Sequence, residues 1–154
     1  MGHIDARLSE LGITLPGVAT PVAAYVPAMM TGNLLFTAGQ LPFVDGALVA
    51  TGKVGREVSV SEAADLARIC ALNALAAAKS VLGSLDRVTR VVKVNGFVAS
   101  MPDFIGQPQV LNGASEFLGE VFGDLGVHAR AAVGVAVLPL DAPVEVELIL
   151  EFSS

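Results

Sequence analysis

The feature that most constrains this chain is an apolar run of mostly small residues near its C-terminus, Val127–Pro139. A run of this kind is typical of a strand that is buried on both faces. A single arginine, Arg130, lies near its start. Because a guanidinium does not lose its proton, burying one is costly unless an anion meets its charge. The run therefore predicts a buried strand with a candidate anion site at Arg130.

A second strand follows after a turn that contains two prolines, Leu138–Pro143. In Val144–Leu150, Glu145 and Glu147 share one face, and the apolar residues share the other. We predict a hairpin that brings Glu145 into the same sheet as Arg130. The spacing does not fix the register, so two interpretations stand: an ordinary ion pair between these two residues, or a ligand site at the arginine.

The remaining elements follow from periodicity and from capping signals. Ser59 and Glu62 form a capping box ahead of a long alanine-rich helix, and Gly12 ends a short amphipathic helix. The glycine-rich segment 43–58 is predicted to be a surface excursion. The predicted elements are a helix at 4–11, strands at 22–30 and 33–37, a helix at 59–82, a strand at 88–99, a helix from Asp103 that is interrupted at Pro108, and the two strands described above.

The element order β-β-α-β-α-β-β predicts an α+β fold, a mixed sheet with both long helices on one face. The chain is 53% hydrophobic and only 16% charged, so its bare sheet face is too apolar to be wet. We therefore expect self-association through the sheet.

Composition also bounds the partners. No apolar run reaches the roughly 18 residues of a membrane span. A net charge of −6 without a cluster of basic residues argues against a nucleic-acid partner. Cys70 is the only cysteine, and His3 and His128 are the only histidines, so we expect no metal site. The start of the chain has no signal-peptide pattern, which favours the cytoplasm.

Short motifs along the chain are, in order, Ala24–Pro27, Phe36–Pro42, Ala129–Val133, Leu138–Pro139 and Val144–Glu147. Together they resemble the Rid (YjgF-type) family of reactive-intermediate imine and enamine deaminases. The resemblance covers residues 20–152 of a single domain, 1–154, and leaves 1–19 as an N-terminal extension. It implies a chorismate mutase-like fold and a homotrimer with a site in each cleft between subunits.

The resemblance also implies roles for individual residues. Arg130 would hold the carboxylate of a 2-imino or 2-enamino acid, with help from the backbone N–H of Ala132. Glu145 would position or activate the water that attacks the C=N carbon. Tyr25 would line the pocket from the neighbouring subunit, and the backbone of Gly39 would face the substrate. No cofactor is required.

One further site residue and two departures concern the same pocket. Asn112 matches an asparagine of the family's second helix if a short insertion around 106–109 is allowed. Ala38 stands where the family has serine, and Ala132 where it has cysteine. Both changes remove polar groups, so a trimeric binder or sensor of small carboxylate metabolites is a second hypothesis. A ribonuclease or translation inhibitor, a label that some members carry, is a third, and the acidic balance argues against it.

Ordinary structural roles compete with some of these assignments. Tyr25 by itself is typical of a packed aromatic residue, and Gly39 of a turn glycine. Cys70 and Asn73 fall on the packed stripe of the long helix, so we expect them in the core. Glu147 is expected to face solvent or an interface.

Overall fold

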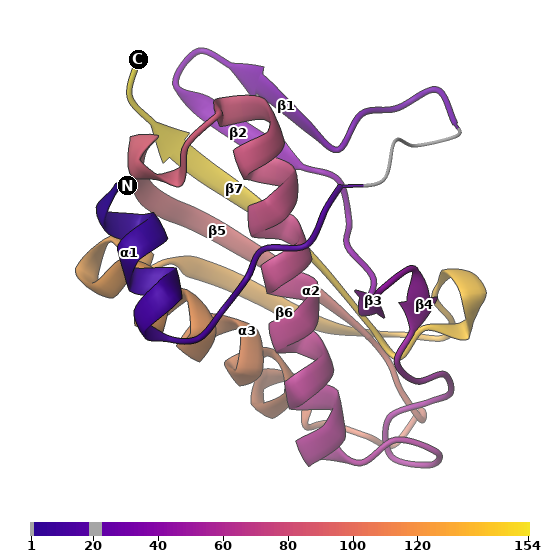
Figure 1. Ribbon diagram of the computed structural model, residues 1–154. Helices are drawn as coiled ribbons and strands as arrows, with labels where there is room; N and C mark the ends of the chain where they lie inside the picture. Colours follow the sequence, from indigo (N-terminus) through magenta and orange to yellow (C-terminus); the bar gives the residue numbers. More distant parts are fainter. Residues whose placement is uncertain (1, 19–22) are drawn as a thin grey trace.

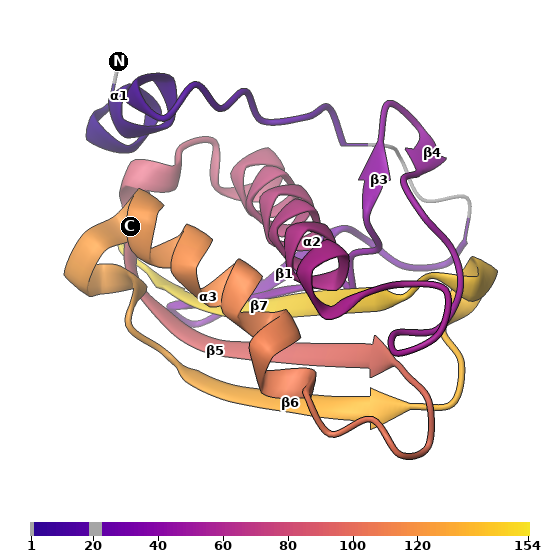
Figure 2. The ribbon, with the colours of Figure 1, turned by 90° about the horizontal axis from the view of Figure 1, so that it is seen from below.

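The computed structural model describes residues 2–18 and 23–154. A mixed five-stranded sheet is covered on one face by two long helices, and the described chain places no helix on the other face (Figures 1 and 2). The strand order is β1-β2-β7-β5-β6, and only β5 and β6 are parallel. The predicted α+β fold is therefore confirmed. The elements are α2 (Val60–Leu82), α3 (Gln107–Phe122), β1 (Ala28–Thr31), β2 (Leu34–Thr37), β5 (Val88–Ala99), β6 (Ala129–Val135) and β7 (Val144–Phe152).

Smaller elements complete the described chain. The glycine-rich excursion contains a short hairpin, and turns of 3₁₀ helix join the larger elements. The first strand begins at Ala28, whereas Val22, the predicted start, lies outside the described residues. No helix in the described ranges is long and apolar enough to cross a membrane. The smaller elements are α1 (His3–Glu10), β3 (Phe43–Val44), β4 (Ala47–Leu48), η1 (Leu85–Arg87), η2 (Gly123–Gly126) and η3 (Pro139–Asp141).

The capping box of α2 is present as predicted. The hydroxyl of Ser59 accepts from the backbone N–H of Glu62 at 3.1 Å, and the Glu62 carboxylate accepts from the Ser59 N–H at 3.1 Å. Gly83 then ends the helix with φ of +82°, a conformation that glycine adopts without strain. The buried face of α2 is mostly alanine, which lets the helix approach both the sheet and α3 closely.

The two long helices approach each other closely at Gly113. A Cβ added there would lie 1.9 Å from the carbonyl oxygen of Ala64 on α2. Backbone atoms cannot yield as a side chain can, so Gly113→Ala is expected to destabilise the fold by roughly 1–3 kcal/mol through overpacking. Urea unfolding measures this free energy.

Gly119 on the same helix is the matched control, because an added Cβ would meet nothing within 4 Å. Gly119→Ala is expected to raise the free energy of unfolding by roughly 0.5–1 kcal/mol, the usual gain of alanine in a helix. Equal effects from the two substitutions would contradict the close helix packing described here.

The prediction that the second long helix starts at Asp103 is wrong. The helix begins at Gln107, with Pro108 in its first turn. Proline is accommodated there because the first N–H groups of a helix have no partner inside the helix. Pro108 thus marks the beginning of α3 rather than an interruption.

The predicted hairpin between the last two strands is also wrong. β5 lies between β6 and β7, and β6 pairs only with β5, in parallel. β6 is therefore an edge strand, and the prediction that Val127–Pro139 is buried on both faces fails for the single chain. Val133, for example, is 44% exposed. The run is apolar, but within one chain only its α3 side is covered.

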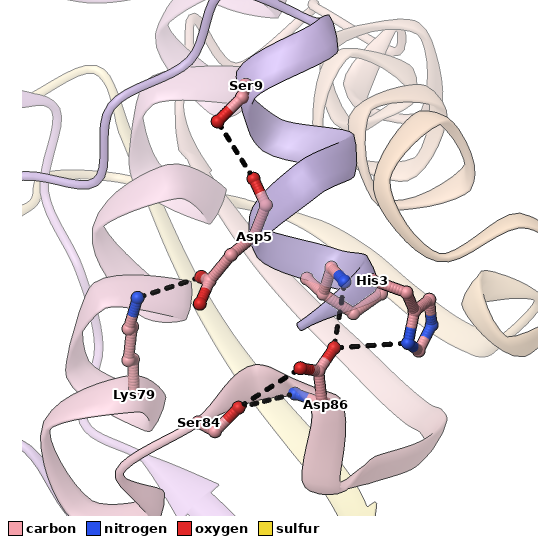
Figure 3. Close-up of polar contacts among 7 residues, drawn as sticks. His3, Asp5, Ser9, Lys79, Ser84 and Asp86 are labelled. Carbon is pink, nitrogen blue, oxygen red and sulfur yellow. Dashed lines mark hydrogen bonds and ion pairs between the residues drawn. The ribbon is translucent and has the colours of Figure 1, made fainter. Parts of the chain in front are cut away.

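Helix α1 attaches the N-terminal segment to the end of the sheet near η1 (Figure 3). Ile4 and Leu8 are buried in the main core. The Asp86 carboxylate accepts from the Ile4 N–H at 2.8 Å and lies 3.1 Å from His3 Nδ1. Lys79 on α2 contacts Asp5 at 2.9 Å. The extension is thus part of the packed structure.

Candidate functional site

Arg130 lies on β6, and its side chain lies on the helix-covered side of the sheet. Nη1 donates to Oδ1 of Asn112 at 2.8 Å and to Oγ of Ser115 at 3.2 Å, both on α3. These acceptors are neutral. Among the described residues, none of the ion pairs includes Arg130. Its charge is therefore held in place by α3 without being compensated there.

Ser115 and His128 lie close to Arg130, but the sequence patterns did not single out either residue. His128 Nε2 lies 2.9 Å from Ser115 Oγ, and His128 Nδ1 lies 2.6 Å from the carbonyl oxygen of Gly126. The available signal was the spacing of two between His128 and Arg130, which favours one face for both when the chain is extended. Ser115 follows Asn112 by three positions, which places both on one face of α3.

Glu145 lies on the opposite face of the sheet from Arg130. Arg130 is paired with Val94, which is fully buried beneath the helices, whereas Glu145 is paired with Phe97 on the same strand. Residues three apart on a strand point to opposite faces. The interpretation that Arg130 forms an ion pair with Glu145 is therefore wrong within one chain.

The carboxyl group of Glu145 is half-buried on the open face of the sheet. Burial raises its pKa above the ordinary value, and the charge of Glu147 on the same face raises it further. Glu147 itself accepts a hydrogen bond from Asn95 at 3.1 Å, so it belongs to a polar row on this face. A carboxylate with a raised pKa is a stronger base than an ordinary one.

Gly39 lies directly against this carboxyl group. A Cβ added at Gly39 would lie 2.1 Å from Glu145 Oε1. The next residue, Gln40, pairs with Val146 through two backbone hydrogen bonds of 2.8 and 3.0 Å, which fixes the approach. Glycine at 39 therefore leaves the space that the Glu145 carboxyl occupies.

A groove of about 680 Å³ opens beside Gly39. Tyr25, 60% exposed, lines one part of it, and Asn73 of α2 lines another. Asn73 Nδ2 donates to the carbonyl oxygens of Leu41 at 3.1 Å and Phe43 at 3.0 Å. Asn73 thus holds the wall of the groove, which is a structural role. The expectation that it lies in the core is wrong, because its side chain is only partly buried.

The candidate residues fall into two groups within one chain. Arg130 and Ala132 lie on the edge strand β6, beside Asn112 of α3. Tyr25, Gly39 and Glu145 lie around β1, β2 and β7, toward the other edge of the sheet. A site that uses both groups needs residues from two chains.

The single cysteine of the chain lies in the core. Cys70 is fully buried, its thiol lies 3.6 Å from the Val144 carbonyl oxygen, and burial raises the pKa of that thiol. A thiol in this state is not reactive. Residues 2–18 and 23–154 contain no group of three or more histidine, cysteine or acidic side chains arranged to hold a metal ion.

Comparison with known proteins identifies the family. Residues 5–152 match the family model described as "YjgF/chorismate_mutase-like, putative endoribonuclease". This chain belongs to the YjgF family. The match begins within α1, so it includes most of the N-terminal helix. The resemblance found in the sequence motifs is thereby confirmed.

Several known proteins are similar to this chain over nearly their whole length. The crystal structure of Atu1372 from Agrobacterium tumefaciens is 49% identical, with a TM-score of 0.90, covering 98% of this chain and 92% of that one. A 2-iminobutanoate/2-iminopropanoate deaminase of Dermatophagoides farinae is 31% identical over 138 residues, 90% of this chain and 93% of the relative. The structure of Escherichia coli TdcF with bound serine is 26% identical, with a TM-score of 0.63, covering 90% and 93%.

These matches confirm the chorismate mutase-like fold of the YjgF family and support a Rid-type function in general terms. Members of this family bind small ligands, as the serine in TdcF illustrates. The substrate of this chain and the roles of its residues are matters of proposal.

Proposed function

We propose that this chain hydrolyses small 2-imino or 2-enamino acids, with Arg130 binding the substrate carboxylate. The observation that carries the proposal is the state of Arg130: a partly buried guanidinium that neutral groups on α3 hold in place. A positive charge placed in this way lacks an anion, and a planar guanidinium matches a carboxylate with two parallel hydrogen bonds. Serine, the ligand of TdcF, carries a carboxylate of this kind.

The reaction needs few groups once the carboxylate is held. Water adds to the C=N carbon, the nitrogen takes up a proton, and the resulting carbinolamine expels ammonia to leave a 2-keto acid. Glu145 is the proposed base, because its raised pKa suits it to accept the proton of the attacking water. An enamine substrate first takes a proton at carbon to become the imine. No cofactor enters these steps.

The two groups of residues come together in this proposal through assembly. Arg130, Asn112 and the backbone N–H of Ala132 come from one subunit, and Tyr25, Gly39 and Glu145 come from its neighbour. β6 is an edge strand whose outer side has no neighbouring strand in the described chain. Apolar residues on the open sheet face are exposed, including Met29 at 59% and Phe36 at 39%. Covering that face buries them and completes the site.

We expect a homotrimer, the assembly that the family resemblance implies. Light scattering at micromolar concentration is expected to give three times the chain mass of 15.7 kDa. A stable monomer would contradict both the assembly and the shared site.

The direct test of the activity is ammonia release from freshly generated 2-iminobutanoate, measured against its spontaneous hydrolysis. Acceleration by wild-type protein is the expected result, and its loss in Glu145→Gln ties it to the proposed base. Binding of 2-ketobutyrate without acceleration would instead support the second candidate, a trimeric carboxylate binder, which Ala38 and Ala132 favour because they remove polar side chains. We assign no nucleic-acid role, because the net charge is −6.

A further inference from the structure

Helix α3 holds Arg130 through only one of its three nitrogens. Nη1 carries two hydrogens, and two acceptors on α3 are within reach: Asn112 Oδ1 at 2.8 Å and Ser115 Oγ at 3.2 Å. Within the described chain, Nε and Nη2 donate no hydrogen bond to a protein group. The guanidinium is therefore engaged along one side and open along the other.

The hydrogen bond from Arg130 leaves the hydroxyl hydrogen of Ser115 free for another partner. Arginine has donors and no acceptor, so Ser115 Oγ must accept from it. The hydroxyl's own hydrogen is then available for another acceptor, and His128 Nε2 lies 2.9 Å away. For Ser115 to donate in this way, His128 Nε2 must carry no proton.

In a neutral imidazole ring, the backbone at Gly126 imposes that condition on His128. The ring Nδ1 lies 2.6 Å from the Gly126 carbonyl oxygen, which only accepts, so Nδ1 carries the hydrogen and Nε2 of the neutral ring is the acceptor. Gly126 is buried against α3, where an added Cβ would lie 2.5 Å from the carbonyl oxygen of Leu118. Its carbonyl is thus a fixed point. Arg130 thus donates to Ser115, and Ser115 donates to His128 Nε2. The other ring nitrogen donates to the carbonyl oxygen of Gly126.

We propose that Ser115 and His128 are positioning residues, which hold Arg130 so that it binds a carboxylate side-on, through Nε and Nη2. A guanidinium can bind a carboxylate end-on through its two Nη atoms or side-on through Nε and one Nη. The end-on mode needs a hydrogen of Nη1, and both are engaged by α3. This inference rests on the proposed function of Arg130 and specifies how that residue recognises its ligand.

The first test needs no ligand. Two-bond ¹H–¹⁵N correlation spectra at pH 8, where histidine side chains are ordinarily neutral, report which ring nitrogen of His128 is protonated. The Nδ1–H form is expected in the wild type. The Nε2–H form would overturn the proposal, because Ser115 could then not donate to the ring.

The second test measures 2-ketobutyrate binding by calorimetry. Ser115→Ala is expected to weaken binding about 10-fold, the loss of one hydrogen bond to a charged group, and Ser115→Thr is expected to restore it because it returns the hydroxyl. His128→Phe keeps a flat ring but removes the nitrogen that accepts from Ser115, so it is also expected to weaken binding. Ser61→Ala, an exposed helical serine on α2, is the matched control and is expected to bind as the wild type does.

The outcomes separate this inference from the proposed function. If the wild type binds 2-ketobutyrate and Arg130→Lys does not, but Ser115→Ala binds normally, the positioning role is wrong while the anion site stands. If no small carboxylate binds the wild type, the proposed function fails, and the histidine spectrum still decides the hydrogen-bond series. The Arg130 Nε–H resonance should shift on binding, and an unmoved Nε–H would contradict the side-on mode.

Discussion

Arg130→Lys is expected to lose nearly as much affinity for 2-ketobutyrate as Arg130→Ala, roughly 2–5 kcal/mol of binding free energy. Lysine keeps the positive charge but is a point donor, so it cannot engage Asn112 and Ser115 and still offer two parallel hydrogen bonds to a carboxylate. Calorimetric titration of each variant measures the loss.

The same substitutions are expected to change the free energy of unfolding by less than about 1 kcal/mol. Asn112 and Ser115, which lose a hydrogen-bond donor when Arg130 is replaced, are neutral. Asn112 is also exposed to water, which can replace the lost hydrogen bond. Arg90→Lys, at an exposed position on β5, is the matched control and should leave both binding and stability unchanged. A large loss of stability for Arg130→Ala, together with a wild type that binds no small carboxylate, would make Arg130 a structural residue.

Local sequence signals predicted the helices and the element order well, because each rests on neighbours in the chain. The capping box at Ser59 and Glu62 and the glycine at 83 act within a few residues, and both mark α2 correctly. The sequence predicts an interruption at Pro108 because the effect of a proline depends on where the helix begins, and the turn before Gln107 gives no strong signal.

The strand pairing could not be read from the sequence in the same way. A proline turn between two strands is consistent with a hairpin, but the long connection through α3 makes β6 a parallel neighbour of β5 instead. This choice depends on how α3 packs across the sheet, which is a tertiary effect. It also decides the relation between Arg130 and Glu145, which the sequence leaves open, since register decides which face a side chain occupies.

For a related reason, the sequence motifs name only part of the hydrogen-bonded cluster around Arg130. The family motifs singled out Arg130 and Asn112, and the structure brings these two into contact at 2.8 Å. Ser115 and His128 belong to no motif, and their hydrogen bonds form only when α3 lies beside β6. Residues that act through contacts between distant segments leave little trace in a single sequence.

Glu145→Gln is expected to lower kcat for 2-iminobutanoate hydrolysis by roughly 10²–10⁴-fold, the usual contribution of a general base. Affinity for 2-ketobutyrate should change little, because Arg130 supplies the carboxylate contact. In the wild type, kcat/KM should rise with pH through the raised pKa of Glu145, since only the ionised carboxylate accepts a proton. A variant that loses affinity at unchanged kcat would show that Glu145 only shapes the pocket.

The same variant is expected to be more stable than the wild type at pH 7. Burial and Glu147 raise the pKa of Glu145 in the folded chain, so between the ordinary value of 4.5 and the raised value the folded state binds more protons than the unfolded state. The free energy of unfolding therefore falls as pH rises through this window, and glutamine, which does not ionise, avoids that loss. Thermal melts should show the advantage of Glu145→Gln at pH 7 and its disappearance below pH 4.5.

Glu116→Gln removes one negative charge at an exposed position on α3 and serves as the control. An equal gain from both variants would indicate a net-charge effect rather than relief of a buried carboxylate.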